Sequence, residues 1–171
     1  MSTTRTALTI FIACFGLFSC STNSDRRIKN EKGKYSILVL ADWDYELKNR
    51  TIRITKKMKF DSLAVPGTLI VAPGNAENLS LEELFSAVEN DLPHQLVDYH
   101  KINEGYTEID KQPAKWLKLS HSLYGYKYIS LRYYLNLNKN TPVMIECSSI
   151  NGTLEEFESD LNRMAFSFKR E

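Results

Sequence analysis

Five segments between residues 96 and 149 have the composition of β-strands, and they constrain the fold more than any other feature of the chain. They lie near residues 96–102, 106–110, 114–121, 127–137 and 143–149, and three earlier segments (35–40, 51–55 and 68–72) have the same character. Short turns separate the last three strands, one containing Gly125 and the other formed by Asn138-Lys139-Asn140. Because short turns join antiparallel neighbours, the sequence predicts a mainly antiparallel sheet.

An amphipathic helix is predicted ahead of these five strands. Its apolar residues recur at helical spacing, and they are Leu81, Leu84, Phe85, Val88 and Leu92. Ser80 and Glu83 have the spacing of a capping box, and Leu79 with Leu84 has that of a hydrophobic staple. We expect Pro93 to end this helix because proline cannot continue the hydrogen-bond ladder.

A second helix is predicted after the last strand, starting at Thr153 with Glu156 as its capping partner. Its apolar stripe consists of Leu154, Phe157, Leu161 and Met164. Phe166 and Phe168 alternate with a serine, which indicates a short closing strand. Two main amphipathic helices and an antiparallel sheet give an α+β fold, a layered α/β/α sandwich.

The order of these elements resembles that of PsbP-like and DcrB-like domains over about residues 35–169. The resemblance rests on four short segments: Asp42-Trp43, the helix start at residues 80–84, the stretch 113–117, and the close on residues 166–168. It implies an α/β/α domain over residues 35–171. Members of this family share roles in binding or assembly rather than in catalysis, so the resemblance implies a binding protein.

The N-terminal segment, residues 1–19, has the pattern of a signal peptide. Its apolar run, residues 7–18, is shorter than the roughly 20 residues that a membrane-spanning helix needs. The end of the run, Leu17-Phe18-Ser19-Cys20, resembles the lipobox of bacterial lipoproteins, which implies cleavage before Cys20 and lipid attachment to it. Residues 20–34 would then be a lipidated cysteine and a flexible tether. An ordinary secretory signal with an incidental cysteine, or a short membrane-inserted segment, is the alternative.

These features place the protein in the bacterial cell envelope, anchored to a membrane through Cys20. Ser21 after the cysteine resembles an outer-membrane sorting context, which favours the periplasmic side of the outer membrane. Lysine and arginine number 22 against 21 for aspartate and glutamate. This balance argues against a dedicated nucleic-acid-binding protein, which usually carries a strong basic excess.

No catalytic, metal or cofactor motif is present in the sequence. The histidines (His94, His100 and His121) lack metal-ligand spacing, and Cys147 lies in an apolar strand, as a small buried hydrophobe does. The best hydrolase pair, Ser120 and His121, consists of neighbours on one strand, whose side chains point to opposite faces. We therefore expect a protein without enzymatic activity.

Strand register predicts one candidate binding face. Pairing Leu137 with Thr141 places Leu135 opposite Val143 and Arg132 opposite Glu146. Pairing His121 with Lys127 in the preceding hairpin then places Trp116 beside Arg132. The predicted row is Trp116, Arg132 and Glu146, flanked by Tyr128 and Tyr134. Two interpretations stay open: a face covered by a helix in which Arg132 and Glu146 pair, or an exposed recognition patch of aromatic residues and arginine.

Two functions are compatible with these predictions. The first is a non-catalytic envelope lipoprotein that binds a partner protein and supports the assembly or maintenance of a complex. The alternative is a lipoprotein that holds a small molecule or lipid in a pocket on the sheet.

Overall fold

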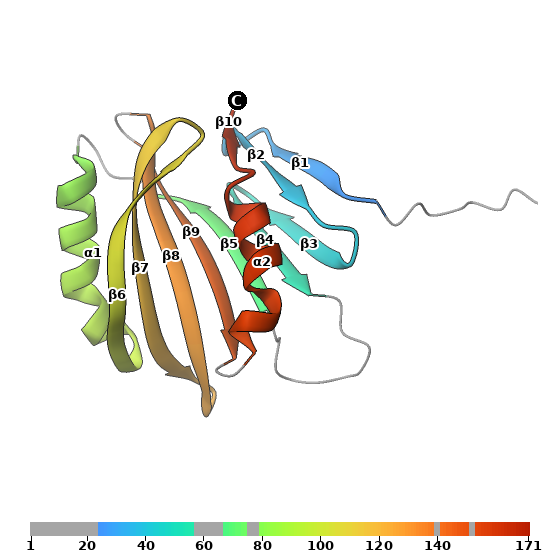
Figure 1. Cartoon of the computed structure of the whole chain (residues 1–171). Coiled ribbons are helices and arrows are strands. Elements are labelled where there is room, and N and C mark those ends of the chain that lie inside the picture. Colours follow the sequence, from blue (N-terminus) through green and yellow to red (C-terminus); the bar gives the residue numbers. More distant parts are fainter. Residues whose placement is uncertain (1–23, 57–66, 75–78, 139–140, 151–152) are drawn as a thin grey trace, which may run out of the picture.

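The computed structural model describes residues 24–56, 67–74, 79–138, 141–150 and 153–171. Its centre is a seven-stranded antiparallel sheet in the order β3-β4-β5-β9-β8-β7-β6 (Figure 1). These strands are β3 (Trp43–Lys48), β4 (Thr51–Lys56), β5 (Gly67–Pro73), β6 (Val97–Ile109), β7 (Gln112–Leu123), β8 (Tyr126–Asn138) and β9 (Thr141–Ile150). The two strands expected over residues 96–102 and 106–110 form one strand, β6, whose register shifts twice. The signal segment and Cys20 lie outside the described residues.

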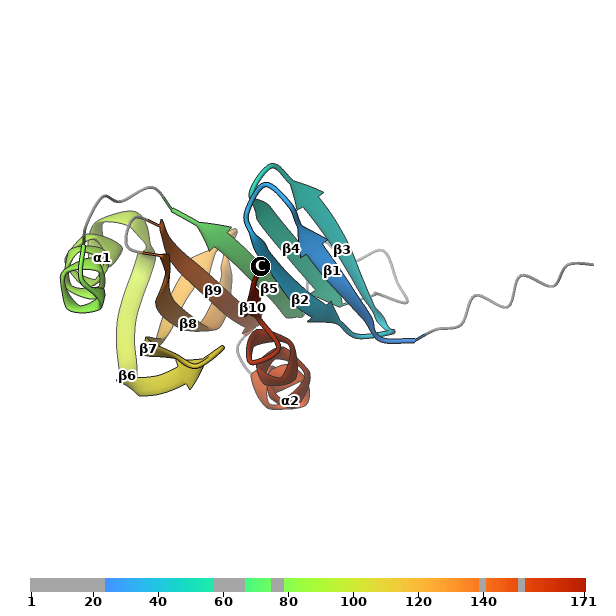
Figure 2. The ribbon, with the colours of Figure 1, turned by 90° about the horizontal axis from the view of Figure 1, so that it is seen from above.

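Two helices lie on opposite faces of this sheet. Helix α1 (Leu81–Gln95) packs against β6, β7 and β8, while α2 (Leu154–Ala165) packs against β9 and β5 (Figure 2). A smaller sheet lies on the same face of the large sheet as α2. It consists of β1 (Arg26–Asn30), β2 (Tyr35–Val39) and β10 (Lys169–Arg170). The fold is therefore α+β and layered, as the sequence predicts. Within the described residues, no helix is both long enough and apolar enough to cross a bilayer.

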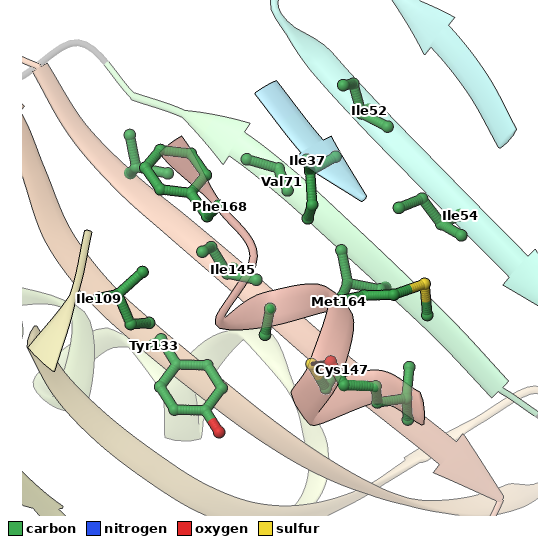
Figure 3. Close-up of a cluster of buried hydrophobic side chains, with 14 of the residues drawn as sticks. Ile37, Ile52, Ile54, Val71, Ile109, Tyr133, Ile145, Cys147, Met164 and Phe168 are labelled. Atoms are coloured by element: carbon green, nitrogen blue, oxygen red, sulfur yellow. Dashed lines mark hydrogen bonds between the residues drawn. The ribbon is translucent and has the colours of Figure 1, made fainter. Parts of the chain in front are cut away.

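The main core lies between the large sheet, α2 and the small sheet. Its buried side chains include Ile37, Ile52, Ile54, Val71, Ile145, Cys147, Met164 and Phe168 (Figure 3). The predicted stripe of α2 faces this core, because Phe157, Leu161 and Met164 are all buried. Cys147 is a free, buried cysteine within this core, as expected.

A second, smaller core lies under α1. Leu84, Phe85 and Leu92 of the helix pack there with Leu117, Leu119 and Tyr134 of the sheet, and with Leu79 and Val88 at its edge. The predicted capping box is present, with the Ser80 hydroxyl accepting from the Glu83 amide and the Glu83 carboxylate accepting from the Ser80 amide. The helix does not end at Pro93 but continues to Gln95. Pro93 lacks only one donor in the last turn, and its fixed φ suits a helix.

The cap expected for α2 is wrong. Thr153 precedes the helix, but its side chain makes no capping bond; its hydroxyl donates instead to the Ile150 carbonyl, at 2.8 Å. The strand expected around Phe166 and Phe168 is also displaced. Phe166 caps α2 and Phe168 enters the core, so the closing strand, β10, begins only at Lys169.

The expected flexible tether is wrong over residues 26–30. These residues form β1 and pair with β2 in antiparallel register, from Arg26 opposite Val39 to Asn30 opposite Tyr35. A turn between them is held by the Gly33 amide, which donates to Asn30 Oδ1 at 2.8 Å. The sequence shows no apolar periodicity here because β1 is mostly exposed, and main-chain hydrogen bonds do not require apolar side chains. The folded domain therefore begins before residue 35.

Candidate functional site

The register predicted for β8 and β9 is confirmed along most of the hairpin. Arg132 pairs with Glu146, Tyr133 with Ile145, and Leu135 with Val143. Only the closing pair differs, because a register irregularity after Asn136 places Asn138, rather than Leu137, opposite Thr141. One face of this hairpin is apolar and joins the core under α2, so a slip by one residue would bury polar side chains there.

The register predicted for β7 and β8 is wrong by one residue. Trp116 lies opposite Tyr133, not Arg132, and His121 lies opposite Tyr128, not Lys127. The cause is a tight turn in which only Tyr124 and Gly125 separate the paired residues Leu123 and Tyr126. Both turn residues have positive φ, 52° and 81°, the backbone of a type I′ hairpin. Because side chains alternate along a strand, this shift moves Trp116 to the opposite face of the sheet.

Arg132 and Glu146 share a face with Tyr134 and Tyr128, and α1 covers part of that face. The guanidinium Nη2 of Arg132 lies 3.2 Å from Glu146 Oε2. Arg132 is only 9% exposed, and the Tyr134 ring packs edge-to-face on Phe85 of α1. Tyr128 is half-buried and stacks on His121. The structure therefore has the geometry of the helix-covered interpretation, with a paired arginine and carboxylate beneath the surface.

The hydrogen bonds around Glu146 are not arranged to activate Ser130 as a nucleophile. Ser130 Oγ donates to Glu146 Oε1 at 3.1 Å, and His121 Nε2 lies 3.2 Å from the same hydroxyl. In a Ser-His-acid triad the histidine stands between the other two groups. Here the serine stands between the histidine and the carboxylate, and Ser130 is fully buried. Burial also lowers the pKa of His121, which disfavours the charged form of the ring.

Trp116 instead lines a cleft between α2 and strands β6 to β8, which we call the aromatic cleft. It has a volume of about 330 Å³. Its lining residues are Asn103, Tyr106, Thr107, Trp116, Lys118, Leu131, Tyr133, Glu158 and Phe166. Trp116 is half-buried and Phe166 is 46% exposed, so aromatic surface is available in this cleft.

Neighbouring residues fix the aromatic side chains of the cleft. Tyr133 packs edge-to-face on Phe166, with ring centroids 5.5 Å apart, and its hydroxyl donates to Asn162 Oδ1 on α2. Gly105 leaves room for the indole, since a Cβ there would lie 2.8 Å from Trp116 Cζ2. The cleft thus presents aromatic groups whose positions are largely set before any partner binds.

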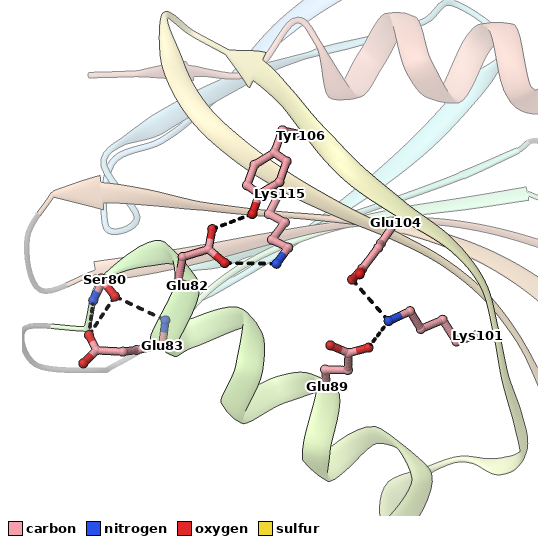
Figure 4. A network of polar contacts seen from close by, with 8 residues as sticks. All are labelled: Ser80, Glu82, Glu83, Glu89, Lys101, Glu104, Tyr106 and Lys115. Atoms are coloured by element: carbon pink, nitrogen blue, oxygen red, sulfur yellow. Dashed lines mark hydrogen bonds and ion pairs between the residues drawn. The ribbon is translucent and has the colours of Figure 1, made fainter.

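A polar network on the face of the sheet that carries α1 connects this helix to strands β6 and β7 (Figure 4). Glu82 of α1 accepts from the Tyr106 hydroxyl and from Lys115, each at 3.0 Å. Lys101 of β6 bridges Glu89 and Glu104. The Tyr106 side chain is therefore directed to α1, and the aromatic side chains that the cleft offers are those of Trp116, Tyr133 and Phe166.

Within the part of the chain that the structure describes, no three histidine, cysteine or acidic side chains are grouped so that they could hold a metal ion. Burial raises the pKa of the Cys147 thiol far above its usual range, which makes this cysteine a poor nucleophile. The described geometry therefore offers two features for binding, the aromatic cleft and the region around Arg132 under α1.

No protein-family model matches the sequence, and no curated protein matches it. Solved structures do resemble it. Cyanobacterial PsbP (CyanoP) from Synechocystis sp. PCC 6803 superposes with a TM-score of 0.63 at 16% identity, covering 90% of this chain and 96% of that one. This chain has a PsbP-like fold.

Two other solved structures share the PsbP-like fold. LpqN, involved in cell envelope biogenesis of Mycobacterium tuberculosis, has a TM-score of 0.67 at 10% identity, covering 85% of this chain and 90% of its own. The Saccharomyces cerevisiae Ran-binding protein Mog1p has a TM-score of 0.58 at 11% identity, covering 86% and 95%. At such identities the likeness concerns the fold, and function has to be argued from the sites of this chain.

Proposed function

We propose that this protein is a non-catalytic envelope lipoprotein that binds a partner protein through the aromatic cleft. The observation that carries the proposal is the aromatic cleft between α2 and the sheet, in which the exposed Phe166 and the half-buried Trp116 lie beside the buried Tyr133. Tryptophan and tyrosine are enriched among the residues that dominate binding energy at protein interfaces. Two proteins of the same fold are compatible with this role, one Ran-binding and one involved in envelope biogenesis.

The charged groups at the cleft fit a protein partner better than an apolar ligand. Lys118 and Glu158 line it together with Asn103 and Thr107, so the aromatic centre has a polar rim of both charge signs. Protein interfaces commonly combine an apolar centre with a polar rim. Cross-strand pairing and the Gly105 contact hold the indole in place, which lowers the entropy lost on binding.

A lipid at Cys20 would hold the domain close to the membrane. Because β1 already begins at Arg26, only residues 21–25 lie between the lipidated cysteine and the sheet, a reach of about 18 Å when fully extended. Helix α2 lies between the small sheet, where β1 runs, and strands β6 to β8 (Figure 2).

The anchor is tested by intact mass analysis of the mature protein purified from native membranes. We expect an N-terminus at an acylated Cys20, and we expect Cys20→Ala to lose the lipid mass and leave the membrane fraction. Cys147→Ala, which keeps the lipobox, is the matched control and should stay in the membrane fraction. A mature chain that starts at any other residue would refute the anchor.

The partner site is tested by a photo-crosslinking amino acid placed at Phe166 of the full-length protein in its native membrane. We expect one discrete cross-linked protein, and we expect Trp116→Ala to remove that band. A crosslinker at Tyr124, the 91% exposed residue of the β7–β8 turn, is the control for accessibility. The same cross-linked products from both positions, or none from Phe166, would contradict the proposal.

A further inference from the structure

The aromatic cleft extends about 12 Å along α2. Glu158 and Phe166 both line it, and residues eight apart on a helix are separated by about 12 Å along its axis, at about 1.5 Å per residue. On the side of the sheet, Asn103 and Thr107 of β6 line the same cleft. Four residues of a strand span about 13 Å, so the two sides give the same length.

A cleft of this length and volume fits an extended peptide better than a helix. Its volume is about 330 Å³. A helix with its side chains is about 10 Å across, so a 12 Å length of it fills about 900 Å³, and even half of that exceeds the cleft. An extended chain in the polyproline II conformation rises about 3.1 Å per residue, so about four residues span the cleft.

Most of the cleft lies over the face of the sheet and not along its edge. Trp116 and Tyr133 belong to β7 and β8, and each of these strands is hydrogen-bonded to a neighbour on both sides. A peptide over these two strands cannot add a strand to the sheet, because strand addition needs a free edge. Side chains therefore have to hold it, through ring contacts and hydrogen bonds.

The cleft offers donors for the carbonyl oxygens of such a peptide. The indole Nε1 of Trp116 has no hydrogen-bond partner among the described residues, and it is not one of the buried unpaired atoms, so it is open to solvent. Lys118 is half-buried and forms no ion pair with the described residues. A polyproline II chain has no internal hydrogen bonds and proline has no N–H, so such a chain brings free acceptors and few donors.

We propose that the aromatic cleft binds a short proline-rich segment of the partner protein in the polyproline II conformation. This inference rests on the partner-binding function proposed above and adds the chemistry that the partner presents. The rings of Trp116 and Phe166 pack against proline rings, as in other aromatic-lined grooves that bind such segments, and Trp116 Nε1 donates to a peptide carbonyl. Tyr133 packs on Phe166 and is held by Asn162, so the aromatic surface is in place before the segment binds.

The test is calorimetric and NMR titration of the purified full-length protein with an end-capped hexaproline peptide and, separately, with a Gly-Ser peptide of the same length. We expect saturable binding of hexaproline with a shift of the Trp116 indole N–H signal, and at least tenfold weaker binding of the Gly-Ser peptide. Phe166→Ala should weaken hexaproline binding at least tenfold. Trp116→Phe keeps a ring but loses the donor, and it should weaken binding about fivefold, the effect of one lost hydrogen bond.

Tyr124→Ala is the matched control, because it removes a 91% exposed aromatic ring outside the cleft and should leave the affinity unchanged. The proposal is overturned if hexaproline does not saturate, if the Gly-Ser peptide binds as tightly, or if neither Phe166→Ala nor Trp116→Phe weakens binding more than the control does. A partner cross-linked at Phe166 without any binding of hexaproline would uphold the proposed function and refute only the proline-rich segment.

Discussion

Trp116 and Tyr133 lie directly opposite each other on β7 and β8, and this pairing places the indole on the face of the sheet that carries α2. The same pairing separates Trp116 from Arg132, its neighbour in the predicted row. The two residues therefore lie on opposite faces of the sheet, Trp116 in the aromatic cleft and Arg132 under α1. One hairpin turn decides this separation, because only two residues, Tyr124 and Gly125, connect the paired strands.

Gly105→Ala should displace Trp116 in the aromatic cleft without replacing any residue that lines the cleft. The new methyl group would lie 2.8 Å from Trp116 Cζ2, so the indole has to move. We expect a loss of about 1–3 kcal/mol of unfolding free energy, typical of overpacking, and a changed NMR shift of the Trp116 indole N–H. Thr107→Ala, on the same face of β6, is the control and should leave that shift in place. An unchanged indole signal in Gly105→Ala would show that the contact is wrong.

Phe85→Ala should destabilise the protein by about 3–5 kcal/mol, the usual cost of removing a buried phenylalanine. The ring is 2% exposed and packs against Tyr134, while Lys115 lies over its face. A urea titration monitored by circular dichroism measures the change, with Ser86→Ala on the exposed side of α1 as the control. A midpoint equal to that of the parent protein would contradict the packing of α1.

Ser80→Ala should cost about 1 kcal/mol through loss of the helix cap. Ser80 and Glu83 cap each other reciprocally, so Glu83→Ala should remove part of the same interaction. The double variant should therefore cost less than the sum of the two single variants. Denaturant unfolding of all four proteins gives this coupling energy, and strict additivity would show that the capping box is not formed.

His121 should make the protein less stable in mild acid. Burial lowers its pKa in the folded state below the ordinary value of 6.5. Below about pH 6.5 the unfolded chain binds a proton that the native state resists, so the free energy of unfolding falls as the pH drops. Stability measured at pH 7.5 and 5.5 should fall less in His121→Gln than in the parent protein. Equal falls in both proteins would contradict this role for His121.

Local sequence signals were sufficient for the start and the apolar stripe of α1 and for most of the β8–β9 hairpin. The capping box depends only on Ser80 and Glu83, which are three residues apart, and local bonds form in nearly any tertiary context. The register of β8 and β9 followed from alternation, because a slip of one residue would no longer set Leu131, Tyr133 and Leu135 opposite the apolar residues Cys147, Ile145 and Val143. The α+β class followed from the same patterns.

The sequence also carried a signal for the β7–β8 turn. A residue followed by glycine between two apolar strands is typical of a two-residue hairpin turn, and Tyr124-Gly125 fits that pattern. Because tyrosine rarely adopts positive φ, the sequence favours the longer turn, which pairs His121 with Lys127. The resulting error of one residue was enough to place Trp116 on the wrong face.

The sequence by itself therefore determined the two helices, strands β2, β4, β5 and β7 to β9, and the apolar face of the last hairpin, but not β1, β3 or the place of β10. The tertiary structure alone decided that residues 26–30 pair with β2, that Arg132 lies buried under α1, and that Trp116 joins Phe166 in a cleft. The physical reason is the range of the interactions. Caps and alternation act between residues close in the chain, whereas burial and cleft formation depend on which distant elements share a face of the sheet.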